Sequence, residues 1–229
     1  MAVNLLNCTF EENEATTKDG KYAGTVLNNS YTAIGVAHCT FAGNAFSGGT
    51  CADIVNINSW NSEIKAVNSV FWSEAADYRP LTGFGASPAA FGSCVIRNYD
   101  GIDFGEKPPV LFGQGVWTDD PVLRAASAAG PNGVWARRLA GCSPFVRRGF
   151  DDVWFCDNRI WVHSGTVTGK EGKPWLALSS KTSQSSATPP AGLTLASPRT
   201  RDAWGRLRRP RRLSLGPVNV DLGLTLIVK

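Results

Sequence analysis

Three aromatic and two charged side chains in the first eighty residues have the chemistry to contact a sugar polymer. Trp60, Trp72 and Tyr78 offer flat apolar rings with a polar edge, which suit the faces of sugar rings. Asp77 and Arg79 flank Tyr78 and place charged groups beside it. We therefore predict that these five residues bind a ligand, namely a polysaccharide or a cell-surface glycan. The alternative is that Trp60 and Trp72 only cover corners of a core.

Carboxylates offer a second kind of chemistry, because enzymes that cleave polysaccharides use acidic side chains as acid and base. Asp77 or Asp103 together with Arg79 is the best set of this kind. No acidic residue recurs at a spacing that would stack it on another, and the Asp119-Asp120 pair is more simply a turn. The sequence favours a protein without catalysis, assigns no catalytic residue, and leaves enzymatic activity open.

Metal and cofactor chemistry finds little support. Of the two histidines, His38 is expected on the outward face of a strand, and His163 has no partner motif. The chain contains no phosphate-binding loop, dinucleotide fingerprint, nucleophile elbow or CxxC site. We predict no metal site and no cofactor.

The elements that must position these residues are indicated by an internal repeat. One phrase occurs four times, and its second residues lie 31, 30 and 25 positions apart: Asn7-Cys8-Thr9-Phe10, His38-Cys39-Thr40-Phe41, Asn68-Ser69-Val70-Phe71 and Ser93-Cys94-Val95-Ile96. A period of this length is typical of a solenoid, in which each repeat packs on its neighbours. No window keeps a helical period for more than a turn or two, which excludes a helical solenoid.

Alternation within each phrase predicts a strand with one buried face. Its inward residues would be Leu6, Cys8 and Phe10 in the first copy, and the equivalent Ala37 and Val67 in later ones. Superposed, the copies give an inward row Cys/Cys/Ser/Cys beside a row Phe/Phe/Phe/Ile. Like residues would then pack on like, and the three cysteines would stack as small buried side chains.

A second element lies between the phrases. Residues 24–29 match residues 52–58, with Asn28 and Asn56 in register, and Asn13 and Asn44 are expected at corners. Each repeat thus contains at least two short strands separated by polar corners.

The three remaining cysteines lie outside the stacked row, and among them Cys142 and Cys156 are the best candidates for a disulfide.

These phrases resemble those of right-handed parallel β-helix proteins of the polymorphic outer-membrane and choice-of-anchor surface-protein type. The resemblance rests on Ala23–Asn28 followed by His38–Asn44, and continues in the phrases Asp120–Leu123, Gly130–Trp135, Arg138–Pro144, Asp202–Arg206 and Val220–Gly223. It implies a pectin-lyase-like solenoid, here its C-terminal portion, in a secreted or cell-surface protein. The chain departs from the family pattern at Val146-Arg147-Arg148 and after Gly223.

The organisation expected is an all-β, right-handed parallel β-helix fragment with an irregular C-terminal extension. Residues 1–118 would form the β-helix coils, 119–178 a Trp-rich closing segment, and 179–229 a Ser/Thr/Pro linker with a basic tail and a final strand. Seven arginines against one acid between 199 and 212 give that tail its charge. Without a nucleic-acid module or interleaved aromatics beyond Trp204, a solvated tail is favoured over a specific nucleic-acid site.

The chain starts without a signal peptide or a capping segment, so it is expected to be N-terminally truncated. It has no apolar window of transmembrane length. The functional expectation is a monomeric, non-catalytic, secreted or cell-surface module for adhesion or glycan binding. The alternatives are a polysaccharide lyase or glycoside hydrolase of the β-helix type, and a purely structural surface stalk.

Overall fold

A computed structural model gives an all-β arrangement for the described part of the chain. The described residues are 2–16, 22–29, 31–47, 50–56, 62–85, 88–124, 138–140, 142–145, 148–150, 153–156, 159–163, 175–178 and 185–186. Within them the single helical element is a short 3-10 turn, η1 (Tyr99–Gly101), and no helix is long and apolar enough to cross a membrane.

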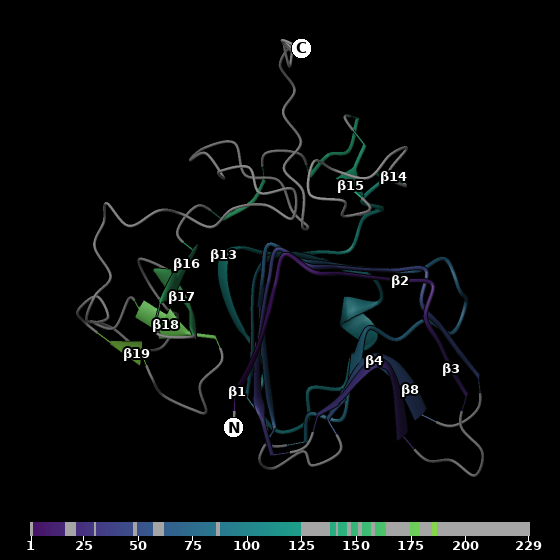
Figure 1. The fold of residues 1–229 in the computed structure, drawn as a ribbon, viewed down its shortest axis with the longest axis horizontal. Coiled ribbons are helices and arrows are strands. Elements are labelled where there is room, and N and C mark those ends of the chain that lie inside the picture. The colour runs from purple at the N-terminus through teal and green to yellow at the C-terminus, as the bar shows by residue number, and fades with distance from the viewer. Residues whose placement is uncertain are drawn as a thin grey trace.

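A large parallel sheet organises residues 2–117 (Figure 1). One row of paired strands comprises β1 (Ala2–Leu6), β5 (Ala33–Ala37), β9 (Glu63–Val67), β12 (Ala89–Ile96) and β13 (Val110–Trp117). A second row comprises β2 (Thr9–Glu11), β6 (Thr40–Ala42), β10 (Val70–Trp72) and the end of β12. Each strand therefore pairs with its counterpart in the next copy of the phrase, in parallel register.

Two smaller parallel sheets follow the same rule. One contains β4 (Tyr22–Asn29), β8 (Thr50–Asn56) and β11 (Leu81–Thr82), and the other contains β3 (Glu14–Thr16) and β7 (Ala45–Ser47). The predicted register of Asn28 with Asn56 is wrong by one residue. A register shift between Gly24 and Leu27 pairs Asn28 with Val55, and Asn29 with Asn56. An extra residue on one of two paired strands changes the register in this way.

The predicted corner asparagines are confirmed as a ladder. Asn44 Oδ1 accepts hydrogen bonds of 2.9 Å from both the backbone N–H and the side-chain amide of Asn13. The Asn44 amide in turn donates to the Phe10 carbonyl at 3.1 Å. The side chain of Asn44, at the bend between β6 and β7, thus satisfies backbone groups in β2 and at the bend between β2 and β3.

The first residue of each phrase bends the chain, and this changes which residues face inward. Asn7, His38, Asn68 and Ser93 all have φ between 51° and 56°. A left-handed residue interrupts the alternation of a strand, so the inward series runs through residues 34, 36, 39 and 41. The prediction that Leu6, Ala37 and Val67 face inward is therefore wrong, because these side chains lie in an apolar cluster on the other face of the sheet.

The two predicted inward rows are confirmed in the core. Phe41 stacks between Phe10 and Phe71, with ring centroids 4.8 and 4.4 Å away. Ile96 continues this row, and Cys8, Cys39 and Cys94 pack in the same cluster. Ser69 occupies the third position of the cysteine row and is fully buried.

The segment after β12 folds across the end of this core. Tyr99, Ile102 and Phe104 pack against the inward cluster. The Phe104 ring lies 4.9 Å from Phe84 and 5.8 Å from Phe91. Residues 98–104 thereby cover apolar side chains of the inward cluster.

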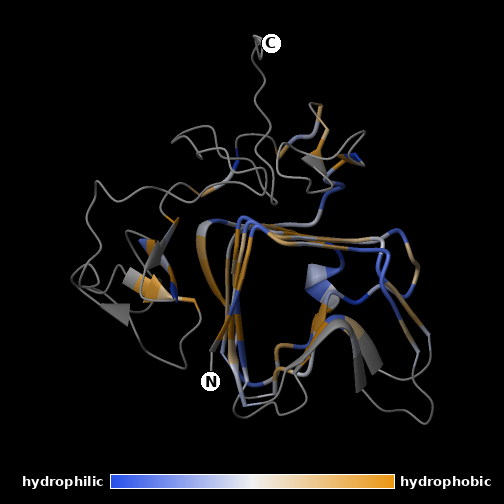
Figure 2. Ribbon diagram, in the orientation of Figure 1, coloured by the Kyte–Doolittle hydropathy of each residue, from blue (hydrophilic) through white to orange (hydrophobic). Residues whose placement is uncertain are grey.

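The outer face of the β5–β9–β12 row is covered by an antiparallel sheet. Its strands are β16 (Val153–Cys156), β17 (Arg159–His163), β18 (Trp175–Ala177) and β19 (Ser185–Ser186). Ile160 and Val162 pack against Ala37, Val67 and neighbouring side chains, and Figure 2 shows the apolar residues on both sides of this contact. A two-stranded antiparallel pair, β14 (Leu123–Arg124) and β15 (Arg138–Leu139), lies between the two regions in sequence.

His38 is completely buried, so the prediction of an outward, solvent-exposed histidine is wrong. It occupies the bend position between Asn7 and Asn68 in the adjacent repeats. The Asn68 side chain at the same bend is bonded to the backbone of Phe150, so the C-terminal region covers this corner. Alternation within one strand reports neither the pairing of repeats nor a contact with a distant segment such as Phe150.

The predicted Cys142–Cys156 disulfide is not formed, because Cys142 is a free and exposed thiol. The boundaries at 118/119 and 178/179 stay predictions. The basic run at 199–212 lies outside the described residues.

A candidate ligand-binding groove at one corner

Three hollows meet where the chain leaves β10, β12 and β13. Their volumes are about 460, 650 and 530 Å³. The first and second share Asn98 and Gly101, and the second and third share Trp72, Glu74 and Asp120. We call this continuous surface the corner groove, and its charged and aromatic side chains at the surface are Trp72, Glu74, Asp77, Arg79, Arg97, Tyr99, Asp100, Asp103 and Asp120.

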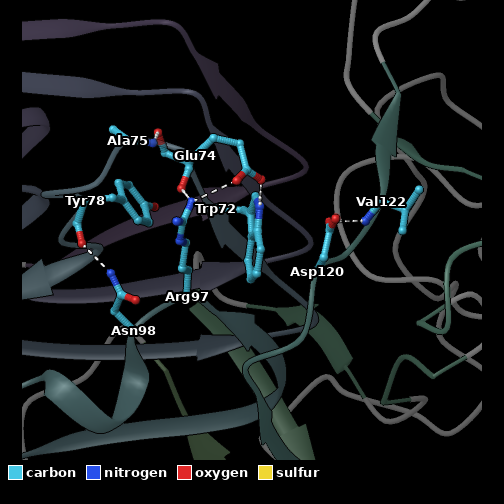
Figure 3. Close-up of polar contacts among 9 residues, drawn as sticks. Trp72, Glu74, Ala75, Tyr78, Arg97, Asn98, Asp120 and Val122 are labelled. Carbon is cyan, nitrogen blue, oxygen red and sulfur yellow. Dashed lines mark hydrogen bonds and ion pairs between the residues drawn. The ribbon is translucent and has the colours of Figure 1, made fainter.

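Trp72 lies at the junction of two of these hollows and is held in place by polar contacts (Figure 3). Its indole N–H donates to Glu74 Oε1 at 2.7 Å. The Arg97 guanidinium lies 5.4 Å from the ring centre, within the range of a cation–π contact. The half-buried ring also packs against the apolar cluster that contains Val70 and Val95. Trp72 therefore covers a corner of the core and still contributes to the groove.

Arg97 links the two loops that carry the groove. Its guanidinium donates to the Ser73 carbonyl and pairs with the Glu74 carboxylate at 3.3 Å. The hydrogen bond from Trp72 and the contact with Arg97 lower the pKa of Glu74 below its ordinary value. Glu74 thus keeps its negative charge, which orients both the indole and the guanidinium.

Tyr78 is buried, so the prediction of an exposed aromatic at this position is wrong. Its hydroxyl donates to Asp53 Oδ2 at 2.5 Å, and its carbonyl accepts a hydrogen bond of 2.9 Å from the Asn98 amide. Burial, together with the negative charge of Asp53, raises the pKa of Tyr78 well above its ordinary value. The residue anchors the loop, and its exposed neighbours Asp77 and Arg79 line the first hollow.

The groove is acidic. Five carboxylates line it (Glu74, Asp77, Asp100, Asp103 and Asp120), against the two guanidinium groups of Arg79 and Arg97, which gives a net charge of −3. Two of these carboxylates also hold turns. Asp103 Oδ1 accepts from the Gly105 N–H at 2.8 Å, and Asp120 Oδ1 accepts from the Val122 N–H at 2.7 Å. The latter bond confirms the turn predicted at Asp119-Asp120.

The structure brings together most of the residues that the sequence singled out. Trp72, Asp77, Tyr78 and Arg79 all line the corner groove, and so does Asp103. Trp60 lies outside the described residues. Whether any of these residues binds a ligand stays a prediction.

Arg97 was missed, although a signal for it exists. It follows Ile96 in the repeat as Trp72 follows Phe71, and these two core residues pair in the parallel sheet. The position after the phenylalanine row therefore places Trp72 and Arg97 side by side at the same corner. Within the described residues, no group of three or more His, Cys, Asp or Glu side chains is placed to hold a metal ion.

Comparison with known proteins assigns no relative to this chain. No family model, no curated protein and no solved structure matches it.

Proposed function

We propose that the chain is a right-handed parallel β-helix of the polymorphic outer-membrane and choice-of-anchor surface-protein type, and that it binds a glycan in the corner groove. Support for the fold comes from the parallel pairing of each strand with its counterpart in the next repeat, and from the stacked phenylalanine row. The handedness and the secreted or cell-surface location follow from the resemblance of the phrases. Fractionation of cells that express the full-length chain tests the location.

The observation that carries glycan binding is the position of Trp72. A flat ring at the junction of two hollows, fixed by Glu74 and Arg97, offers an apolar surface that loses little side-chain freedom when a sugar stacks on it. The carboxylates of Glu74, Asp100 and Asp120 line the same hollow as Trp72 and are acceptors for sugar hydroxyls. Three hollows that share lining residues suit several sugar units better than one.

The net charge of the groove disfavours acidic glycans. Five carboxylates against two guanidinium groups repel polymers of uronic acids and attract sugars that carry amino groups. The negative charge of the groove neither strengthens nor weakens the binding of neutral glycans. The proposed ligands are therefore neutral or amino-sugar polymers.

Binding to a panel of neutral, amino-sugar and uronic-acid oligosaccharides, measured by calorimetry, tests this function. Trp72→Ala is expected to weaken the affinity about tenfold, equivalent to about 1.4 kcal/mol. Tyr31→Ala is the matched control, because Tyr31 is an exposed aromatic outside the groove and its loss leaves affinity unchanged. A folded protein that binds no member of the panel, or a Trp72→Ala variant that binds as the parent does, overturns the proposal.

A second candidate is a polysaccharide-cleaving enzyme, favoured by one observation. Asp77, Arg79 and Asp103 line the same hollow of about 460 Å³, so the predicted acid–base set is brought together. Incubation with neutral, amino-sugar and uronic-acid polysaccharides, followed by assay of reducing ends and of unsaturated uronate absorbance, tests it. Turnover that Asp77→Asn and Asp103→Asn abolish supports the enzyme, and absence of turnover leaves a binding protein or a structural stalk.

A further inference from the structure

Cys8 and Cys39 are direct neighbours in adjacent repeats. Residues on both sides of them pair in parallel, Leu6 with Ala37 and Thr9 with Thr40. The Cys8 backbone N–H donates to Cys39 Sγ at 3.4 Å, and the Cys39 thiol lies 3.4 Å from the Leu5 carbonyl. The sulfur of Cys39 is therefore in contact with the backbone of the end of β1 and of Cys8, which lies at the bend between β1 and β2.

The backbone geometry suits a covalent link between these two residues. Adjacent strands of a sheet lie about 4.8 Å apart, and a disulfide requires Cα atoms roughly 4.4–6.8 Å apart. The residues that precede the two cysteines have nearly equal φ values, 56° at Asn7 and 54° at His38. The two side chains thus leave equivalent bends and enter the same core cluster.

Among the described residues, this is the one place in the row where cysteine stacks on cysteine. The next position holds Ser69, whose hydroxyl accepts a hydrogen bond of 3.1 Å from the Cys39 N–H. Cys94 lies beyond Ser69 and is completely buried, and burial raises its pKa to about 12. The serine therefore separates Cys94 from the other two thiols and makes it an internal control.

The two neighbouring thiols differ in access and acidity. Cys8 is half-buried, and its hydrogen bond with Cys39 lowers its pKa from 9.0 to about 7. Cys39 is completely buried, and the loss of hydration raises its pKa well above 9.0. Cys8 has the properties of an attacking thiolate, and Cys39 those of a second thiol that acts only after the first has reacted.

We propose that Cys8 and Cys39 are a redox pair that reacts with small disulfides and closes an inter-repeat disulfide. The Cys8 thiolate attacks one sulfur of the small disulfide, forms a mixed disulfide, and releases one thiolate. The Cys39 thiol then gives its proton to solvent and attacks the sulfur of Cys8, which releases the second thiolate. Two protein thiols are oxidised, one small disulfide is reduced to two thiols, and the link closes a loop of about thirty residues.

The test uses the full chain and oxidised glutathione as the disulfide, with native alkylation and peptide mapping by mass spectrometry. The expected product is a Cys8–Cys39 cross-linked peptide, which dithiothreitol reverses, while Cys94 stays reduced. The initial rate should rise with pH and reach half its maximum near pH 7. Cross-linking should also raise the thermal midpoint of the protein.

Variants separate the two steps. Cys39→Ser is expected to stop at the mixed disulfide on Cys8, Cys8→Ser to abolish the reaction of the pair, and Cys94→Ser to leave it unchanged. If Cys39→Ser does not fold, the peptide map of the parent protein and its pH profile still decide the matter. Absence of the Cys8–Cys39 peptide at full consumption of accessible thiols, or a rate that rises only near pH 9, overturns the proposal.

Discussion

Apolar side chains are buried in different ways in the parallel region, residues 2–117, and in the antiparallel sheet β16–β19. In the parallel region, equivalent residues of successive repeats pack on one another, as Phe10, Phe41 and Phe71 do. In the antiparallel sheet, β16 pairs with the nearby β17, and the sheet packs on the parallel region through unlike residues. The first kind of contact follows from a repeated sequence, and the second depends on unique complementary shapes.

Two contacts show what packing of unlike residues requires, one inside the parallel region and one at its outer face. Gly92 lies under the ring of Phe112, and a Cβ atom built on Gly92 would come within 2.0 Å of that ring. The Asn68 side chain exchanges two hydrogen bonds with the backbone of Phe150, one of them 2.8 Å long. Both residues stand in a repeated phrase or directly before one, and neither contact follows from the repeat itself. Gly92 leaves room for a ring of the next paired strand, and Asn68 joins the outer face of the parallel region to the segment before β16.

The largest effect is expected from the centre of the stacked row. Phe41→Ala removes a completely buried ring that contacts rings above and below it, and should lower the free energy of unfolding by about 3–5 kcal/mol. Urea unfolding followed by tryptophan fluorescence and circular dichroism measures the loss. Both signals should shift together, because the stack joins three successive repeats.

Ile160→Ala sharpens this comparison. Ile160 is also completely buried, but it lies in the antiparallel sheet. Its loss should increase hydrogen exchange in β16–β18 and leave the amides of β5 and β9 protected. If exchange in β5 and β9 rises equally, the two regions unfold as one cooperative unit and the distinction between them fails.

A smaller effect is expected from Gly92→Ala. The added methyl group must displace the Phe112 ring, whose centre lies 5.7 Å from the centre of the Phe150 ring. Overpacking of this kind lowers the free energy of unfolding by about 1–3 kcal/mol. Gly101→Ala is the matched control, because a Cβ atom at Gly101 would meet nothing within 4 Å. Combining Gly92→Ala with Phe112→Ala should restore space and give a smaller loss than the sum of the two changes. Additive losses in denaturant unfolding would contradict the direct contact.

The contrast also explains how much the sequence could predict. The spacing of the repeat was enough to predict the stacked cysteine and phenylalanine rows. A period of 25–31 residues places Phe41 on Phe10, whatever the other contacts of the chain are. The inward phase at Ala37 and Val67 was predicted wrongly, because a bend at a non-glycine residue such as His38 leaves no mark on the apolar pattern. The burial of His38 was missed for a related reason, since alternation within a strand gives no sign of contacts between repeats or with distant segments.

The corner groove could be predicted in part, unlike the stacked rows, which were predicted fully, and the burial of His38, which was missed. Trp72, Asp77 and Arg79 were found from residue type, and the parallel pairing of Phe71 with Ile96 then places Arg97 beside Trp72. Asp100 and Asp120 could not be predicted to join them, because they lie in segments after β12 and β13 whose path no repeat determines. Residue type suggested the chemistry, while the set of charges that selects a ligand depends on irregular connections.

The smallest effect, and the most local, is expected from Asn68→Gly. Glycine keeps the left-handed backbone at this bend, where Asn68 has a φ of 51°, and removes only the side chain that bonds the Phe150 backbone. Loss of these bonds should cost about 1–2 kcal/mol and should appear first as faster exchange of the Phe150 amide and of β16–β17. Asn7→Gly is the control, because Asn7 has an equivalent bend in the first repeat with a φ of 56°. If both variants loosen β16–β17 to the same degree, docking of the antiparallel sheet depends on the bend itself, and Asn68 does not set the boundary between the two regions.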